Sequence, residues 1–99
     1  AKPNLDFERI KRIKEVTHIP LVMHGGSGLS REDYLTAIDK GIRKINYYTY
    51  MSKAAALAAK ELLDGKENVL FHDIALAALE AMKRDSENAM KVFYKNVLD

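Results

Sequence analysis

The sequence predicts an α/β fold in which two parallel strands are joined by a helix. Three observations support this prediction. Residues 19–24 form an apolar run without alternation, which is typical of a strand covered on both faces within a parallel sheet. Residues 42–47 are β-branched and aromatic, which indicates a second strand. The segment between them has helical periodicity, so the three together predict a βαβ unit.

Composition limits the class of protein. The chain has 99 residues, of which 47% are hydrophobic and 30% charged, as expected for one small globular segment. Its 16 basic and 14 acidic residues are interspersed, so no basic stripe indicates nucleic-acid binding. No apolar run approaches the roughly 18 residues of a membrane span, and the N-terminus lacks a signal-peptide pattern. We therefore expect a cytoplasmic protein that binds neither nucleic acid nor membrane.

The first predicted helix precedes the first strand. Asn4 or Asp6 can cap its N-terminus, and Pro20 prevents it from continuing. Between these limits the apolar side chains recur every three residues, at Phe7, Ile10, Ile13 and Val16. This spacing predicts a short amphipathic helix.

The second predicted helix covers 30–40. Ser30 and Asp33 have the spacing of a capping box with Asp in place of Glu, and Gly41 supplies the C-terminal stop. Between these ends Tyr34, Ala37 and Ile38 share one face of the helix. A helix with these ends connects the two strands directly.

The C-terminal third is predicted to be helical. Residues 51–65 are rich in strong helix formers and end at Gly65, and apolar residues keep helical spacing from 73 to about 96. We interpret 1–99 as one segment with a helical extension over 66–99. Two parallel strands alone leave both sheet edges open, so we expect further strands from a partner or from a larger protein.

Polar and glycine residues follow the first strand, where ligands collect in parallel β/α proteins. His24 closes the strand, and the segment 25–28 then allows backbone N–H groups to approach an anion at the start of a helix. Asn46 occupies the corresponding end of the second strand, and Thr49 follows at the start of the next helix. The pattern predicts an anion site beside an imidazole.

Simpler interpretations remain open at this point. His24 could be structural, the glycine segment could be a plain strand-to-helix turn, and Asn46 could only cap a helix. His18 and His72 are interpreted as surface or capping residues without a functional role. The absence of cysteine excludes disulfides, thiolate metal sites and thiol nucleophiles, so any metal needs His, Asp or Glu ligands.

The stretch LVMHGGSGLSREDYLTAIDKGIRKINYYTYM resembles the carboxy-terminal part of the class II, metal-dependent fructose- and tagatose-bisphosphate aldolases. In that family one strand ends in His-Gly-Gly-Ser-Gly and the next contains Lys-Ile-Asn-x-x-Thr. A weaker likeness extends from about 6 to 93. The resemblance implies the carboxy-terminal portion of a (β/α)8 TIM barrel, about strands 7 and 8 with their flanking helices.

The resemblance also implies roles for individual residues. His24 matches a ligand of the catalytic zinc, and Asn46 matches the asparagine near the reacting carbons, which we assign as catalytic and substrate-binding. The family's remaining zinc histidines and its catalytic aspartate lie upstream of the matched segment. The Tyr47–Tyr48 pair departs from the family pattern. The residues assigned to the substrate phosphate are Gly25, Gly26, Ser27, Gly28, Tyr48 and Thr49.

In such an enzyme the metal polarises the ketone of dihydroxyacetone phosphate, and Asn46 donates to the developing oxyanion. The first hypothesis is therefore a fragment of a zinc-dependent ketose-bisphosphate aldolase. Its reaction is the reversible cleavage of fructose or tagatose 1,6-bisphosphate to dihydroxyacetone phosphate and glyceraldehyde 3-phosphate. We expect the isolated chain to be inactive and to form a homo-oligomer. The alternatives are a non-catalytic sugar-phosphate-binding module and a structural half-barrel that assembles with a partner.

Overall fold

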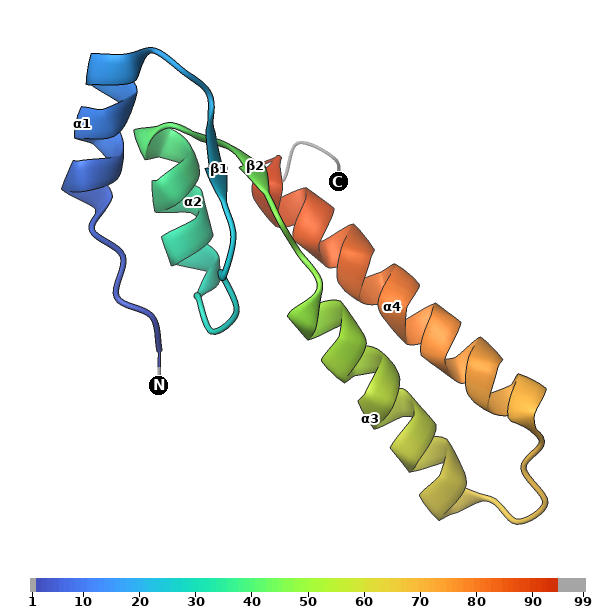
Figure 1. Cartoon of the computed structure of the whole chain (residues 1–99). Helices are drawn as coiled ribbons and strands as arrows, with labels where there is room; N and C mark the ends of the chain where they lie inside the picture. The colour runs from blue at the N-terminus through green and yellow to red at the C-terminus, as the bar shows by residue number, and fades with distance from the viewer. Residues whose placement is uncertain (1, 95–99) are drawn as a thin grey trace. The chain divides into compact units, whose positions relative to one another are not determined.

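The computed structural model describes residues 2–94, which form six elements (Figure 1). They divide into two compact units, one holding the residues up to Tyr47 and the segment that begins at Lys91, the other holding Tyr48–Met90. No helix within these described residues is long and apolar enough to cross a membrane. The elements, in chain order, are α1 (Phe7–Thr17), β1 (Leu21–Met23), α2 (Arg31–Lys40), β2 (Ile42–Ile45), α3 (Thr49–Gly65) and α4 (Phe71–Phe93).

The predicted βαβ unit is present. β1 and β2 are parallel neighbours in a two-stranded sheet, and α2 connects them (Figure 1). Both strands are shorter than predicted, covering 21–23 and 42–45 in place of 19–24 and 42–47. Pro20 has no N–H to donate to the ladder, which accounts for the late start of β1. The sequence prediction of an α/β fold is confirmed at this level.

The core of the first unit lies between the sheet and α2. Its five buried residues come from β1, the loop after it, α2 and β2. Phe7 and Ile10 of α1 pack against this cluster, whereas Val16 is exposed, so the predicted apolar face of α1 is only partly covered. The buried residues are Met23, Leu29, Tyr34, Ala37 and Ile42.

The opposite face of the sheet is open within residues 2–94. Val22 is 50% exposed and pairs in register with Lys44, which is also exposed. The apolar run of β1 predicts a strand that needs cover on both faces, and the open face agrees with the expectation that a partner or a larger protein supplies further strands. The unalternating apolar pattern still has a physical meaning, because Leu21 and Met23 face the helices while Val22 faces the other way.

α2 begins with the predicted capping box. Asp33 N–H donates to Ser30 Oγ at 3.2 Å, and Ser30 N–H donates to Asp33 Oδ2 at 2.9 Å. The Ser30 hydroxyl and the Lys2 ammonium also contact Asp33 Oδ2, at 2.8 and 3.0 Å. These hydrogen bonds from Ser30, followed by that from Lys2, lower the pKa of Asp33 from 3.8 to about 2. The carboxylate that starts α2 is therefore held in its charged form.

This shift predicts an acid dependence of stability. A carboxylate with a depressed folded-state pKa stabilises the fold above its unfolded pKa, and that contribution is lost as pH falls from about 4 to about 2. In Asp33→Asn the free energy of unfolding should decline less steeply over that interval. Urea unfolding at a series of pH values measures the slope, with Glu32→Gln as the matched control. An unchanged slope in Asp33→Asn would contradict the assignment.

The second unit contains α3 and most of α4. The predicted helix over 51–65 begins two residues earlier, at Thr49, and ends at Gly65 as expected. The last helix begins at Phe71 and ends at Phe93, and the rest of the predicted extension, 95–99, lies outside the described residues. Within this unit the Ser86 hydroxyl donates to Met51 Sδ at 3.1 Å, which links the two helices.

Candidate active site

The glycine loop, residues 25–28, connects β1 to the start of α2. Leu29 N–H donates to the Gly26 carbonyl at 3.2 Å, which closes a turn around Ser27 and Gly28. Gly28 occupies the third position of that turn with φ of 94°, a value that suits glycine in a type II turn. A Cβ atom at Gly28 would lie 3.0 Å from Pro3 Cδ, so a side chain there would also require Pro3 to shift slightly.

Tyr34 of α2 is hydrogen-bonded to the glycine loop. Its side chain is buried, and its hydroxyl donates to the Gly26 carbonyl at 2.8 Å. The Phe93 ring packs against the Tyr34 ring with centroids 5.3 Å apart. The loop that carries the predicted phosphate ligands is therefore tied to the hydrophobic core of the first unit.

His24 and Asn46 occupy corresponding positions at the carboxyl end of the sheet. Their predecessors, Met23 and Ile45, are register partners, and Asn46 N–H donates to the Met23 carbonyl at 2.9 Å. Both residues are exposed. The structure thus brings the predicted metal ligand, the predicted catalytic amide and the glycine loop to one end of the βαβ unit.

Lys44 orients the Asn46 amide through a hydrogen bond between two exposed side chains. Its Nζ donates to Asn46 Oδ1 at 2.9 Å. An ammonium group has no acceptor, so the amide must turn its oxygen toward Lys44 and keep its NH₂ group for another partner. Asn46 is therefore arranged as a hydrogen-bond donor, which is the role that stabilising an oxyanion requires.

Tyr48 and Thr49 belong to the second unit. Tyr48 is the N-cap residue of α3, makes no side-chain cap and is 67% exposed, and Thr49 is the first residue of the helix. Their assignment to the phosphate site stays a prediction. Tyr47, by contrast, belongs to the first unit and packs edge-on against Phe93 at 5.8 Å, as expected of a packing residue.

The donor set for a metal is incomplete within the described residues. His24 offers an imidazole at the strand end, but no group of three or more His, Cys, Asp or Glu side chains suited to a metal ion occurs between residues 2 and 94. A catalytic zinc site normally has three protein ligands. His24 fits the part of one ligand, and a complete site needs groups from outside these residues.

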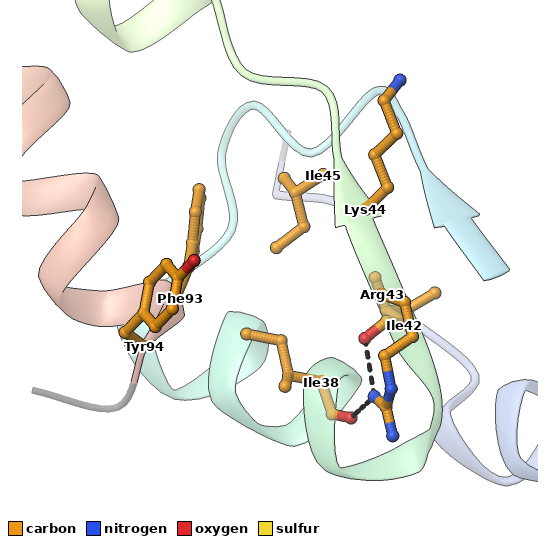
Figure 2. Close-up of a pocket in the computed structure, with 7 residues that line it drawn as sticks. All are labelled: Ile38, Ile42, Arg43, Lys44, Ile45, Phe93 and Tyr94. Carbon is orange, nitrogen blue, oxygen red and sulfur yellow. Dashed lines mark hydrogen bonds between the residues drawn. The ribbon is translucent and has the colours of Figure 1, made fainter. Parts of the chain in front are cut away.

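A pocket of about 420 Å³ lies beside β2, and none of the predicted site residues lines it. In Figure 2 the Arg43 guanidinium turns back toward the end of α2, where Nη1 donates to the carbonyls of Ile38 and Ile42 at 2.8 and 2.9 Å. This arginine therefore stabilises the α2 to β2 connection. The pocket is largely apolar, lined by Ile38, Ile42, Arg43, Lys44, Ile45, Phe93 and Tyr94.

The sequence motifs did not indicate the two supporting residues of the site. Lys44 lies two residues before Asn46, and alternation along a strand places such a pair on one face, so this partner was accessible to a sequence argument. Tyr34 lies eight residues after Gly26, and the sequence pattern indicates only that it shares a helix face with Ala37 and Ile38. No local pattern signals a hydrogen bond that joins a helix to the loop before it.

Comparison with known proteins places the chain in a family. Residues 1–96 match the class II fructose-bisphosphate aldolase family. An uncharacterized protein of Escherichia coli K12, YdjI, is 47% identical over 64 residues, which are 65% of this chain and 23% of that protein. The fructose-bisphosphate aldolase of Mycoplasma pneumoniae is 39% identical over 69 residues, 70% of this chain and 24% of that protein.

Comparison with solved structures also finds an aldolase. The crystal structure of the YdjI aldolase from Escherichia coli K12 matches 92% of this chain with a TM-score of 0.83 and 37% sequence identity. The match covers 34% of that structure, and the chain spans about a quarter of the curated relatives described above. The resemblance predicted from the two motifs is therefore confirmed, and the chain belongs to the class II fructose-bisphosphate aldolase family.

Proposed function

We propose that these residues form part of a longer polypeptide, the complete aldolase, in which they supply the phosphate-binding side of the active site. The reaction is the reversible cleavage of fructose or tagatose 1,6-bisphosphate to dihydroxyacetone phosphate and glyceraldehyde 3-phosphate. The observation that carries the proposal is the placement of His24, Asn46 and the glycine loop at one end of two parallel strands. Family membership supports it. The proposed location is the cytoplasm.

In this proposal the glycine loop holds the substrate phosphate, and the family resemblance adds Tyr48 and Thr49 of the second unit to its ligands. Positive φ at Gly25 and Gly28 allows the loop to present backbone N–H groups, and the N-terminus of α2 follows directly. A phosphate fixed at this place sets where the ketone of the same substrate lies. The Asn46 NH₂ group, kept available by Lys44, then donates to the oxyanion that develops during cleavage.

His24 supplies one zinc ligand in this proposal. When bound, the metal acts as a Lewis acid on the substrate ketone. The further ligands come from the part of the complete aldolase outside these 99 residues, where the remaining strands of a (β/α)8 barrel are also placed. The chain matches about a third of the YdjI aldolase structure, which supports the proposal that a larger protein supplies the remaining parts.

A non-catalytic phosphate-binding module is the second candidate, and it applies to the chain on its own. The described residues contain the anion loop without a three-ligand metal cluster, a combination that favours binding without turnover. The test is cleavage of fructose 1,6-bisphosphate, followed by coupled detection of dihydroxyacetone phosphate. The complete aldolase should lose activity on chelation, and the 99-residue chain should show none. Metal-dependent turnover by the chain alone would contradict the proposal.

We further propose that the isolated chain self-associates. Each strand of the two-stranded sheet has one unpaired edge within the described residues, and Val22 is half exposed on the open face. Pairing of these edges or faces between copies would cover them. Light scattering at micromolar concentration should therefore report a mass above that of one chain. A monodisperse monomer with cooperative unfolding would contradict the prediction.

A further inference from the structure

We propose that Tyr34 is a positioning residue that directs the glycine loop toward the substrate phosphate. Neither the two sequence motifs nor the family match assigns this residue a function. The inference rests on the proposed function, because it concerns the loop that the proposal assigns to phosphate binding. It is carried by two hydrogen bonds to one carbonyl group and by the burial of the tyrosine ring.

Two donors converge on the Gly26 carbonyl oxygen. The Tyr34 hydroxyl donates to it at 2.8 Å, and Leu29 N–H donates to it at 3.2 Å. Tyr34 and Leu29 are both buried members of the core cluster. The Gly26 oxygen is therefore held on the inner side of the loop, toward the core.

The direction of this carbonyl determines the direction of the next N–H group. In a planar trans peptide, the C=O of one residue and the N–H of the following residue point in opposite directions. Since the Gly26 oxygen points toward Tyr34, the Ser27 N–H points toward the exposed side of the loop. Ser27 is itself exposed, so an anion on that side can meet both its N–H and its hydroxyl.

The Tyr34 hydroxyl is well fixed for this task. The side chain is 6% exposed, and its ring packs against Phe93. A Cβ atom at Gly26 would lie 3.2 Å from the Tyr34 hydroxyl and 3.4 Å from its Cε1, so a side chain there would press on the tyrosine. Removing only the hydroxyl keeps the ring packing but leaves the Gly26 peptide with one donor fewer.

The test is a titration of the chain with inorganic phosphate, followed through the backbone amide shifts of residues 25–28. Tyr34→Phe should raise the phosphate Kd about three- to tenfold, the effect of one hydrogen bond. Tyr94→Phe, which removes an exposed hydroxyl in the same unit, should leave the Kd unchanged. Thermal unfolding is measured in parallel. A lower unfolding temperature with an unchanged Kd would show a purely structural role and overturn the inference.

A second variant keeps the test decisive if Tyr34→Phe folds poorly. Gly26→Ala should weaken phosphate binding in the wild-type background, because the Tyr34 hydroxyl must shift to make room for the new methyl group. The same change should cost less in the Tyr34→Phe background, where that close contact is absent. Equal losses in the two backgrounds would contradict coupling between the residues.

The outcomes distinguish the role of Tyr34 from the assignment of residues 25–28 to phosphate binding. If the wild-type chain binds phosphate at residues 25–28 and Tyr34→Phe binds it equally well, only the role of Tyr34 fails. If phosphate causes no shifts at residues 25–28 in the wild-type chain, the phosphate assignment of the loop fails together with the role of Tyr34.

Discussion

His24→Ala in the complete aldolase is expected to abolish zinc binding and to lower turnover by more than about a hundredfold. Loss of a group that only orients a metal ligand commonly costs about 10- to 100-fold in affinity or activity, so loss of a ligand should cost more. His24 is placed for this role because it follows β1 directly, at the carboxyl end of the sheet. Zinc content per protein and initial rates of fructose 1,6-bisphosphate cleavage are the two measurements.

His72→Ala is the matched control for this experiment. It removes an exposed imidazole near the start of α4, where His72 pairs only with the neighbouring Asp73 among the ion pairs of the described residues. Zinc content and turnover should both be retained. Full zinc occupancy with normal turnover in His24→Ala would show that His24 is structural.

Asn46→Ala should reduce kcat by about 10²- to 10³-fold, the usual effect of losing one oxyanion-stabilising donor. Zinc content should not change, since the amide is assigned to the substrate and not to the metal. Asn88→Ala, the same substitution at an exposed position of α4, controls for nonspecific effects. The rate constants are measured by steady-state assay of the complete aldolase.

Asn46→Asp makes this prediction sharper. A carboxylate can still accept the hydrogen bond from Lys44, but it has no NH₂ group to donate to the substrate. We therefore expect Asn46→Asp to be about as impaired as Asn46→Ala. Recovery of kcat in Asn46→Asp would mean that Asn46 acts only as a partner for Lys44.

Local signals explain why much of this fold could be predicted from the sequence. Asp6 accepts from Arg9 N–H as the predicted cap of α1, and Ser30 with Asp33 forms the predicted capping box of α2. Gly41 ends α2 as expected. Each of these features depends on side chains within a few residues of the helix end, which a sequence shows directly.

The features that could not be predicted from the sequence are those that depend on contacts between distant segments. The lengths of the two strands depend on how many residues of each pair with the other strand through backbone hydrogen bonds. The hydrogen bond from Tyr34 to Gly26 likewise depends on how α2 packs against the glycine loop.

For the site, the sequence predicted where the residues lie but not how their side chains are oriented. The ends of β1 and β2 place His24 and Asn46 at corresponding positions, as expected for a parallel pair. The amide orientation set by Lys44 depends on a side-chain contact that the motif does not specify. The zinc and phosphate roles of these residues came from the family resemblance, and they remain proposals for this chain.

The central claim is that the glycine loop holds the substrate phosphate while His24 holds the metal. A crystal structure of the complete aldolase with zinc and dihydroxyacetone phosphate tests it most directly. The account predicts phosphate oxygens within hydrogen-bond distance of N–H groups in residues 25–28 and a His24 ring nitrogen at about 2.0–2.1 Å from zinc. A phosphate bound elsewhere, or a zinc without His24 among its ligands, would contradict it.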